Sequence, residues 1–425
     1  MATYEELVNQ LPTEQLDFVD LRKQGLVYVD KTRYLDWLID SSQPRILFRP
    51  DGFGKRLLVS TLEELFLHGV EPYDGHDSYF KGLEMETLWP KQRQHEGPFY
   101  VLRLNFKELL QDCKSMKEFK ERLNDKVLRF ASDAHLEIKN KYRDLGVISA
   151  FESLLDVVPD HSVVLLVENF EAPLFQFCEP NDNDELQKIV RSLTSFVSNL
   201  KTSESKFRFS LITGSTSLWD WVDLFYGNVL EDISQHPTVA LLCGFTREEL
   251  QRYFPEHLRY AAAQLAKVPL AEVTEPQVEH LLDELCAWYG GYNFNGSERC
   301  KVLSPTSILS FFRERQPSFQ TYWFDRYGVP ELLRKLDPQY EWVKRLRSEE
   351  GKRISRQYFE FSYHCLFVDM PESIMLFRAG FLTVAEVSFN DLHLVSGAKL
   401  GIPNKEIETA LARLASAEGK ARPQG

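Results

Sequence analysis

The sequence ILFRPDGFGKR (residues 46–56) joins a short apolar run to a segment in which leucines recur with helical spacing (residues 58–66). The apolar run predicts a strand that ends before Pro50, and the leucine spacing predicts a helix. Glycines between them let backbone N–H groups turn toward an anion, and the start of a helix adds positive potential. This order is typical of a phosphate-binding loop, although it also fits an ordinary strand–turn–helix junction.

The end of this stretch fits the phosphate-loop pattern G-x-x-x-x-G-K-[ST] only in part. Gly54 and Lys55 match it, and Lys55 would reach the β- and γ-phosphates of a nucleotide. Arg49 stands in place of the first glycine, and Arg56 in place of the final hydroxyl residue. The candidate nucleotide-binding residues of the loop are Asp51, Gly52, Phe53, Gly54, Lys55 and Arg56.

Strand-like and helix-like segments alternate through the first half of the chain. This pattern predicts an α/β fold, a parallel sheet with helices on both faces. Further strands are expected at residues 99–106, 163–169 and 207–213, with helices at residues 117–141 and 184–201. The second of these strands is apolar almost throughout, as a strand buried on both faces must be.

Polar residues stand at the ends of two of these strands. Folds with a phosphate-binding loop hold magnesium and activate water at the acidic end of a buried strand, where this chain has Glu168 and Asn169. Thr213 ends the next strand, where a side chain would contact the terminal phosphate. Strands often end in polar residues, but the order of these positions favours a functional role.

After Gly244 the alternation of strand-like and helix-like segments gives way to short helical segments. We expect an α/β domain over residues 1–244, a helical lid over 245–340 and a small C-terminal α+β domain over 341–425, with a winged helix as one candidate form. Thr246, with Glu249 three residues later, predicts the capped start of a helix. Near the C-terminus we expect a hairpin with its bend at residues 390–391, and a last helix after Pro403-Asn404.

Many blocks of this chain resemble the bacterial AAA-ATPase-like family, whose members often carry a C-terminal restriction-type nuclease. The blocks are YVDKT (28–32), RPDGFGKR (49–56), VVLLVENFEAPL (163–174), LITGSTSL (211–218), LLCGFTREEL (241–250), WYGGYNF (288–294), YWFDRYG (322–328), FRAGFLTV (377–384) and LGIPNKEIE (400–408). The resemblance implies a P-loop NTPase fold of the AAA type over residues 17–411, with a mainly helical C-terminal region and ATP or ADP as candidate ligands. It also places Lys31 near the nucleotide, although Lys31 could instead belong to a helix start in which Asp30 caps exposed amides.

Departures from the family pattern carry the functional argument. Family members usually read R-P-R-R-F-G-K-[ST] at the loop and L-I-D-E-Y-D-A-P at the acidic strand end. Arg56 replaces the hydroxyl and cannot coordinate a cation, so it would take the metal's place and pair with a phosphate. Glu168 is longer than the usual Asp, and Asn169 cannot act as a base. Magnesium is therefore not expected, and Glu168 would be its candidate ligand if it bound.

These departures predict a nucleotide-binding pseudo-ATPase, or a very slow ATPase, that acts as a regulatory or interaction module. One alternative is an active ATPase in which Glu171 or Asp51 compensates for the lost carboxylate. Another is a protein-interaction module that no longer binds nucleotide. A protein partner is expected in each case, and an oligomer is compatible with each.

Composition excludes some classes of function. The net charge of −13 argues against a broad nucleic-acid-binding face. The six cysteines form no C-x-x-C pair and are expected to be reduced and mostly buried. No apolar run is long enough to cross a bilayer, and no secretion signal is apparent, so a cytoplasmic protein is expected. Residues 418–420 match nuclease spacing only superficially, in a polar tail, and nuclease activity is not expected.

Overall fold

The computed structural model describes residues 3–89, 97–138, 149–177, 183–215, 229–329, 334, 342–343, 353–355, 372–389 and 395–417. Its helices up to the end of the large sheet are α1 (Tyr4–Asn9), α2 (Phe18–Lys23), α3 (Arg33–Leu38), α4 (Lys55–His68), α5 (Met85–Leu88), α6 (Phe106–Leu109), α7 (Met116–Asp133), α8 (Ser149–Val157), α9 (Ala172–Phe177) and α10 (Asn183–Thr202). Later helices are α12 (Arg247–Tyr253), α13 (Pro255–Ala266), α14 (Glu275–Tyr289), α15 (Pro305–Arg313), α16 (Tyr322–Tyr327), α20 (Glu372–Arg378) and α21 (Lys405–Ala417).

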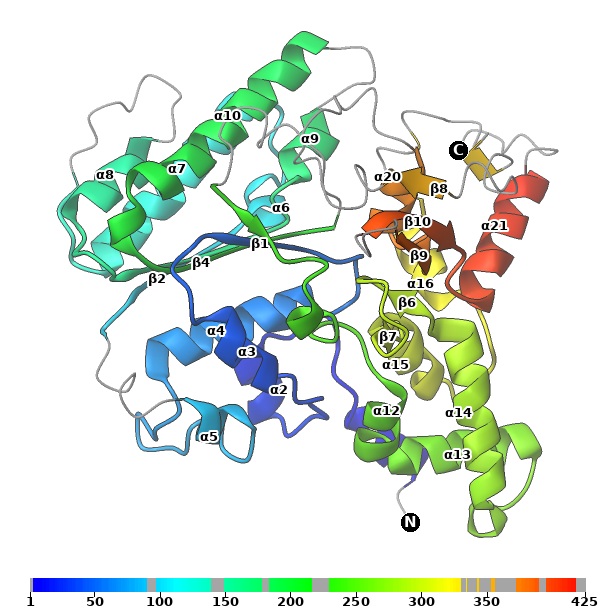
Figure 1. Cartoon of the computed structure of the whole chain (residues 1–425). Coiled ribbons are helices and arrows are strands. Elements are labelled where there is room, and N and C mark those ends of the chain that lie inside the picture. The colour runs from blue at the N-terminus through cyan, green and yellow to red at the C-terminus, as the bar shows by residue number, and fades with distance from the viewer. Residues whose placement is uncertain are drawn as a thin grey trace.

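A parallel sheet of five described strands organises the first half of the chain. Its order is β2-β3-β4-β1-β5, with all four neighbouring pairs parallel. The strands are β1 (Arg45–Phe48), β2 (Tyr100–Asn105), β3 (Val163–Glu168), β4 (Phe207–Gly214) and β5 (Glu231–Asp232). Figure 1 shows α3 and α4 on one face of the sheet and α7, α8 and α10 on the other. The predicted α/β fold is therefore confirmed.

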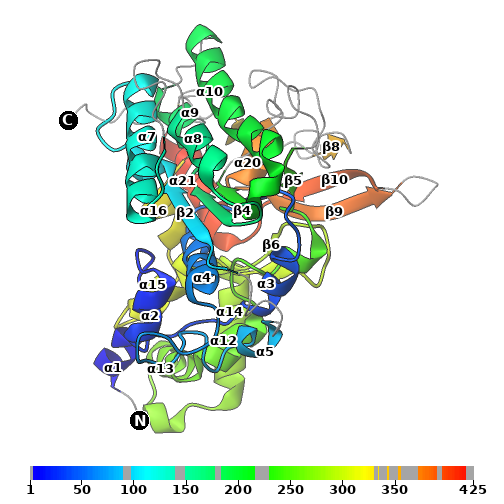
Figure 2. The ribbon, with the colours of Figure 1, turned by 90° about the vertical axis from the view of Figure 1, so that its left-hand side faces the viewer.

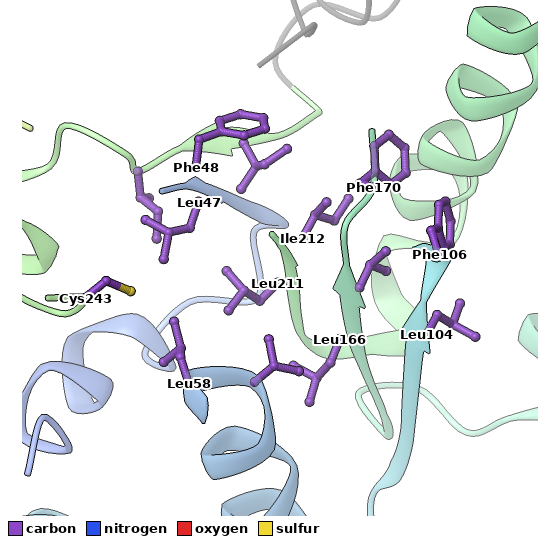
Figure 3. Close-up of a cluster of buried hydrophobic side chains, with 14 of the residues drawn as sticks. Leu47, Phe48, Leu58, Leu104, Phe106, Leu166, Phe170, Leu211, Ile212 and Cys243 are labelled. Atoms are coloured by element: carbon purple, nitrogen blue, oxygen red, sulfur yellow. The ribbon is translucent and has the colours of Figure 1, made fainter. Parts of the chain in front are cut away.

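The core of this sheet consists of apolar side chains from both of its faces. Figure 3 shows Leu47, Leu166 and Leu211 from three neighbouring strands, with Leu58 of α4 facing them. All six residues of β3 are buried, which explains the continuous apolar sequence of this strand. Packing on both faces therefore sets the positions of the strand ends, where the candidate site lies.

Two further groups of elements follow the large sheet. Helices α12–α15 pack around a second apolar cluster that also includes Leu11 and Val29. A short pair β6 (Tyr292–Asn293) and β7 (Lys301–Val302) lies beside them, and β8 (Arg353–Ser355), β10 (Val395–Gly401) and β9 (Thr383–Phe389) form an antiparallel sheet in that order. Figure 2 shows β9 and β10 side by side, reaching out from the body of the molecule.

Several predicted elements differ in detail. The helix expected at residues 117–141 ends at Asp133 and is followed by a turn, where His135 has a φ of 57°. The expected hairpin is present, but its second strand starts only at Val395, and the predicted bend at 390–391 lies outside the described residues. The capping box of Thr246 and Glu249 and the last helix after Asn404 are confirmed.

The described cysteines carry free thiols. Cys113 and Cys243 are buried, whereas Cys286 and Cys300 are partly exposed. Cys178 and Cys365 lie outside the described residues, as do residues 418–420. No helix in the described ranges has an apolar stretch long enough to cross a membrane.

Candidate functional site

The glycine loop connects β1 to α4 and has the backbone geometry that its sequence suggests. Gly54, directly before α4, has a φ of 97°, and Gly52 has a φ of 77°. At Gly52 a Cβ atom would lie 2.2 Å from Thr306 Oγ1, so only glycine fits there. Phe53 is buried and packs edge-on against Tyr292, at 4.8 Å between ring centroids. The side chain of Phe53 therefore anchors the loop in the core.

Residues from later in the chain hold the carbonyl groups of the loop. Trp323 Nε1 donates to the carbonyl oxygen of Asp51 at 2.7 Å, and Thr306 Oγ1 donates to that of Gly52 at 3.2 Å. The backbone N–H of Gly244 donates to the carbonyl oxygen of Phe53 at 3.1 Å. No described residue accepts a hydrogen bond from the N–H groups of Gly52, Phe53 and Gly54. These donors are therefore available to an anion at the start of α4.

Arg49, in the first-glycine position, does not line the cavity described below. Its buried guanidinium donates to the carbonyl oxygens of Phe48 and Ser234, at 2.8 and 2.7 Å, and stacks 4.3 Å from the Phe294 ring centroid. Burial lowers the pKa of Arg49 to about 10. Arg49 therefore connects the end of β1 to the chain that follows β5.

Lys55 and Arg56 begin α4, and both are engaged by the chain itself. Lys55 Nζ donates to the carbonyl oxygens of Arg49 and Pro50, at 2.6 and 3.1 Å, and pairs with Asp51 Oδ1 at 3.1 Å. The Arg56 guanidinium pairs with Asp17 Oδ1 at 2.9 Å and with Glu108 Oε1 at 3.1 Å.

Glu168, at the end of β3, forms an ion pair that sequence reasoning missed. Its Oε1 accepts from Arg103 Nε of β2 at 2.8 Å. Nη1 of Arg103 also contacts Asp17 Oδ2 at 3.0 Å and Glu63 Oε2 at 2.8 Å. Burial raises the pKa of Glu168, and the neighbouring Arg103 opposes this rise. A charged residue within an otherwise apolar strand was the available signal for Arg103.

The remaining strand-end residues make short polar contacts within the fold. Asn169 has a left-handed backbone, with a φ of 54°, and its Nδ2 donates to Asn105 Oδ1 at 3.0 Å. Asn tolerates this conformation better than most other residues do. Thr213 Oγ1 donates to the carbonyl oxygen of Val167 at 3.3 Å.

Glu171 lies beside the site in a different setting. One carboxylate oxygen accepts from the backbone N–H and the hydroxyl of Ser215, both at 2.7 Å. The other oxygen is buried and has no hydrogen-bond partner among the described residues. Burial raises the pKa of Glu171, while Ser215 and, more weakly, Lys55 lower it. Glu171 borders a separate cavity of about 330 Å³ that touches the loop at Asp51.

Lys31 is held by the carboxylate of Glu249, whose two oxygens lie 2.6 and 2.7 Å from its Nζ. Glu249 also caps α12 through the N–H of Thr246. Asp30 accepts from backbone amides directly before two helices, as the alternative interpretation of this segment expected. Asp30 Oδ1 accepts from the N–H of Thr32, before α3 begins at Arg33, and Oδ2 accepts from the N–H of Glu84.

A cavity of about 740 Å³ brings the predicted residues together, and we call it the loop cavity. The predicted residues that line it are Lys31, Asp51, Gly52, Phe53, Gly54, Lys55, Arg56, Glu168, Asn169 and Thr213. Its lining also contains an apolar group of residues, which we call the apolar wall: Leu16, Tyr28, Leu35, Leu58, Phe245 and Phe254. The cavity thus presents amides and charges together with apolar surface.

The donor set of the loop cavity is a poor match to magnesium. Mg²⁺ needs oxygen ligands in near-octahedral geometry, but Glu168 already pairs with Arg103, and Arg56 has only N–H donors. In the described part of the chain, no three acidic, histidine or cysteine side chains are placed to hold a metal ion.

Comparison with known proteins agrees with this geometry. Residues 13–221 match the family described as Predicted AAA-ATPase. Over 409 residues the chain is 27% identical to a protein of Azotobacter chroococcum mcd 1 named "Uncharacterized protein in vnfD 5'region"; the alignment covers 95% of this chain and 69% of that protein. The family match spans the glycine loop and the ends of β3 and β4. With the parallel sheet and this match, residues 13–221 are assigned to the AAA-ATPase-like family.

Proposed function

We propose that the loop cavity binds an adenine nucleotide and that the protein is a pseudo-ATPase or a very slow ATPase. The observation that carries the proposal is that amide donors, Lys55 and an apolar wall meet in one cavity of about 740 Å³. Backbone N–H groups at the start of α4 suit phosphate oxygens, and the apolar wall suits a base.

Slow turnover follows from the groups around Glu168. Arg103 neutralises the carboxylate that would hold magnesium, and Asn169 cannot accept a proton from water. Loss of one such group commonly slows a reaction by about two to four decades. We therefore propose a regulatory or interaction role in the cytoplasm, carried out through a protein partner, rather than a catalytic one.

Calorimetric titration with ATP and ADP tests the proposal. We expect binding of similar strength with magnesium and with a chelator, and hydrolysis near background. Lys55→Ala should weaken ATP binding because it removes the loop cation and leaves Asp51 unpaired. Binding that a chelator abolishes would contradict metal-independent binding. No binding of any nucleotide would support the pure interaction module instead.

A second candidate is an active ATPase that uses Glu171. The unpartnered buried oxygen of Glu171, close enough to Lys55 for their charges to interact, favours it. In that case wild-type protein would hydrolyse ATP, and Glu171→Gln would abolish the activity without loss of nucleotide binding. Under the leading proposal Glu171→Gln leaves the background rate unchanged.

A further inference from the structure

Each of the three cations expected to hold phosphate is already paired with a carboxylate of the chain. Lys55 pairs with Asp51 at 3.1 Å, and Arg56 pairs with Asp17 at 2.9 Å. Lys31 pairs with Glu249 at 2.6 Å. A phosphate that enters the loop cavity must therefore compete with groups that the protein itself supplies.

The three pairs differ in how firmly they are held. Lys31 and Glu249 have side chains only 13% and 11% exposed, and Glu249 is further fixed by the N-terminus of α12. Asp51 is 43% exposed, and its carboxylate makes no other described hydrogen bond. Asp17, the partner of Arg56, is 33% exposed and also pairs with Arg103. Asp51 is therefore the carboxylate that a ligand displaces most easily.

Displacement of Asp51 does not remove its charge from the site. The side chain belongs to the loop itself, so its carboxylate stays within a few ångströms of a phosphate bound to Lys55. Two like charges at that distance repel each other, and each added phosphate increases the repulsion. Lys107 also lines the cavity and is exposed. It has no carboxylate within ion-pair distance in the described chain, so it offers a phosphate one unpaired cation.

We infer that Asp51 is a specificity-determining residue. Its carboxylate competes with phosphate for Lys55, so the cavity selects ligands by their nucleoside rather than by their number of phosphates. The inference rests on the proposed function and names the ligand class of the same site. Asp17 competes with phosphate for Arg56 in the same way, and Glu249 competes with it for Lys31. The apolar wall then supplies most of the affinity.

The test is titration of the full chain with adenosine, ADP and ATP in the presence of a chelator. We expect wild-type dissociation constants within about threefold of one another, because the site cations are already neutralised. In Asp51→Asn, ATP should bind about tenfold more tightly while adenosine is unchanged, because the competing charge is gone. Asp51→Ala is a second variant that also removes the charge.

Asp112→Asn is the matched control. Asp112 lines the same cavity but forms no ion pair with a described residue, so its substitution removes the same charge without releasing Lys55. We expect a change in ATP affinity several times smaller than that of Asp51→Asn. Equal effects of the two substitutions would overturn the inference, as would a wild-type affinity that rises tenfold or more from adenosine to ATP.

The outcomes also separate this inference from the proposed function. Steep wild-type discrimination that Asp51→Asn leaves unchanged would preserve nucleotide binding and reject the role of Asp51. ATP binding that appears only in Asp51→Asn would support the role of Asp51 and reject nucleotide binding by the wild-type chain. No binding by either protein rejects both.

Discussion

Arg103 shares its guanidinium among three carboxylates that come from three different elements. Glu168 ends β3, Glu63 lies on α4, and Asp17 precedes α2. The side chains of Arg103 and Glu168 are only 14% and 4% exposed, so water screens their attraction little. The Arg103 guanidinium therefore lies beside Glu168, where a metal ion would otherwise bind. This arrangement favours stability of the fold over metal binding.

Arg103→Gln should destabilise the protein because it leaves Glu168 and Glu63 without their described counter-ion, whereas Asp17 keeps Arg56. We expect a loss of about 3 kcal/mol in the free energy of unfolding, measured by urea denaturation. Lys81→Gln serves as the control, since Lys81 and Asp77 form an exposed pair with side chains 64% and 63% accessible. A loss no greater than that of the control would show that the network contributes little.

Among the elements, the turn after α14 shows how closely two segments approach. Gly291 has a φ of 79°, and a Cβ atom there would lie 2.1 Å from the carbonyl oxygen of Pro403. The neighbouring Gly290 accepts a hydrogen bond from Asn404 Nδ2 at 2.8 Å. The glycine pair therefore allows the start of α21 to dock on the end of α14.

Gly291→Ala should cost about 3 kcal/mol or more in unfolding free energy, because it adds a clash to a strained backbone. Gly25→Ala is the comparison: Gly25 also has a positive φ, of 64°, but its Cβ would meet open space. There we expect about 1 kcal/mol from the backbone alone. Equal losses in thermal or urea unfolding would mean that the Pro403 contact relaxes without cost.

Helix α21 carries a buried acid at its start. Glu406 accepts from the N–H of Trp323 at 2.7 Å and from Ser307 Oγ at 2.8 Å, and burial raises its pKa to about 7. The folded state then binds the proton more tightly than the unfolded state does. The contribution of Glu406 to stability is therefore complete below about pH 4.5 and is lost as the pH rises through about 7.

Glu406→Gln keeps the shape of the side chain and removes this titration. We expect the variant to gain stability relative to wild type as the pH rises from 5 to 8, by up to about 3 kcal/mol. Urea unfolding at several pH values measures the difference. Glu408→Gln, exposed on the same helix, should show no such trend. A pH-independent difference for Glu406→Gln would disprove the assignment.

Over the whole molecule, the apolar core crosses the boundaries expected between domains. One continuous cluster runs from Phe18, through the large sheet, to Leu411 of α21. The loop carbonyls are held by Thr306 and Trp323, which lie beyond residue 244. The α/β part therefore shares a packed interior with α16, α20 and α21, whereas α12–α15 pack around the second cluster. We propose residues 1–244, 245–340 and 341–425 as units of sequence organisation.

Residues 1–244 produced alone should not fold cooperatively, because Phe53 and the loop lose the groups that cover them. We expect weak near-UV circular dichroism, binding of a hydrophobic dye and no sharp thermal transition. The full chain in the same buffer is the control and should show a cooperative transition. A sharp transition for the fragment would establish residues 1–244 as an independent domain.

Local patterns were enough to predict β1 to β4 of the large sheet. Val163–Glu168 is a strand buried on both faces, and such a strand must consist of apolar residues, so its position is readable directly. Thr246 and Glu249 are three residues apart, and their capping box depends on that spacing alone. The helix expected at residues 117–141 ends earlier than its spacing suggests, because the chain turns after Asp133, where His135 has a φ of 57°.

The identity of the candidate site residues was likewise readable, because glycines and a lysine between a strand and a helix suit phosphate binding. Their ionic partners were not. Arg103 meets Asp17 and Glu168 across 86 and 65 residues of sequence, and Lys31 meets Glu249 across 218. Sequence chemistry shows which groups carry charge, but folding alone sets which charges come within 3 Å, because sheet order and helix packing bring distant segments together.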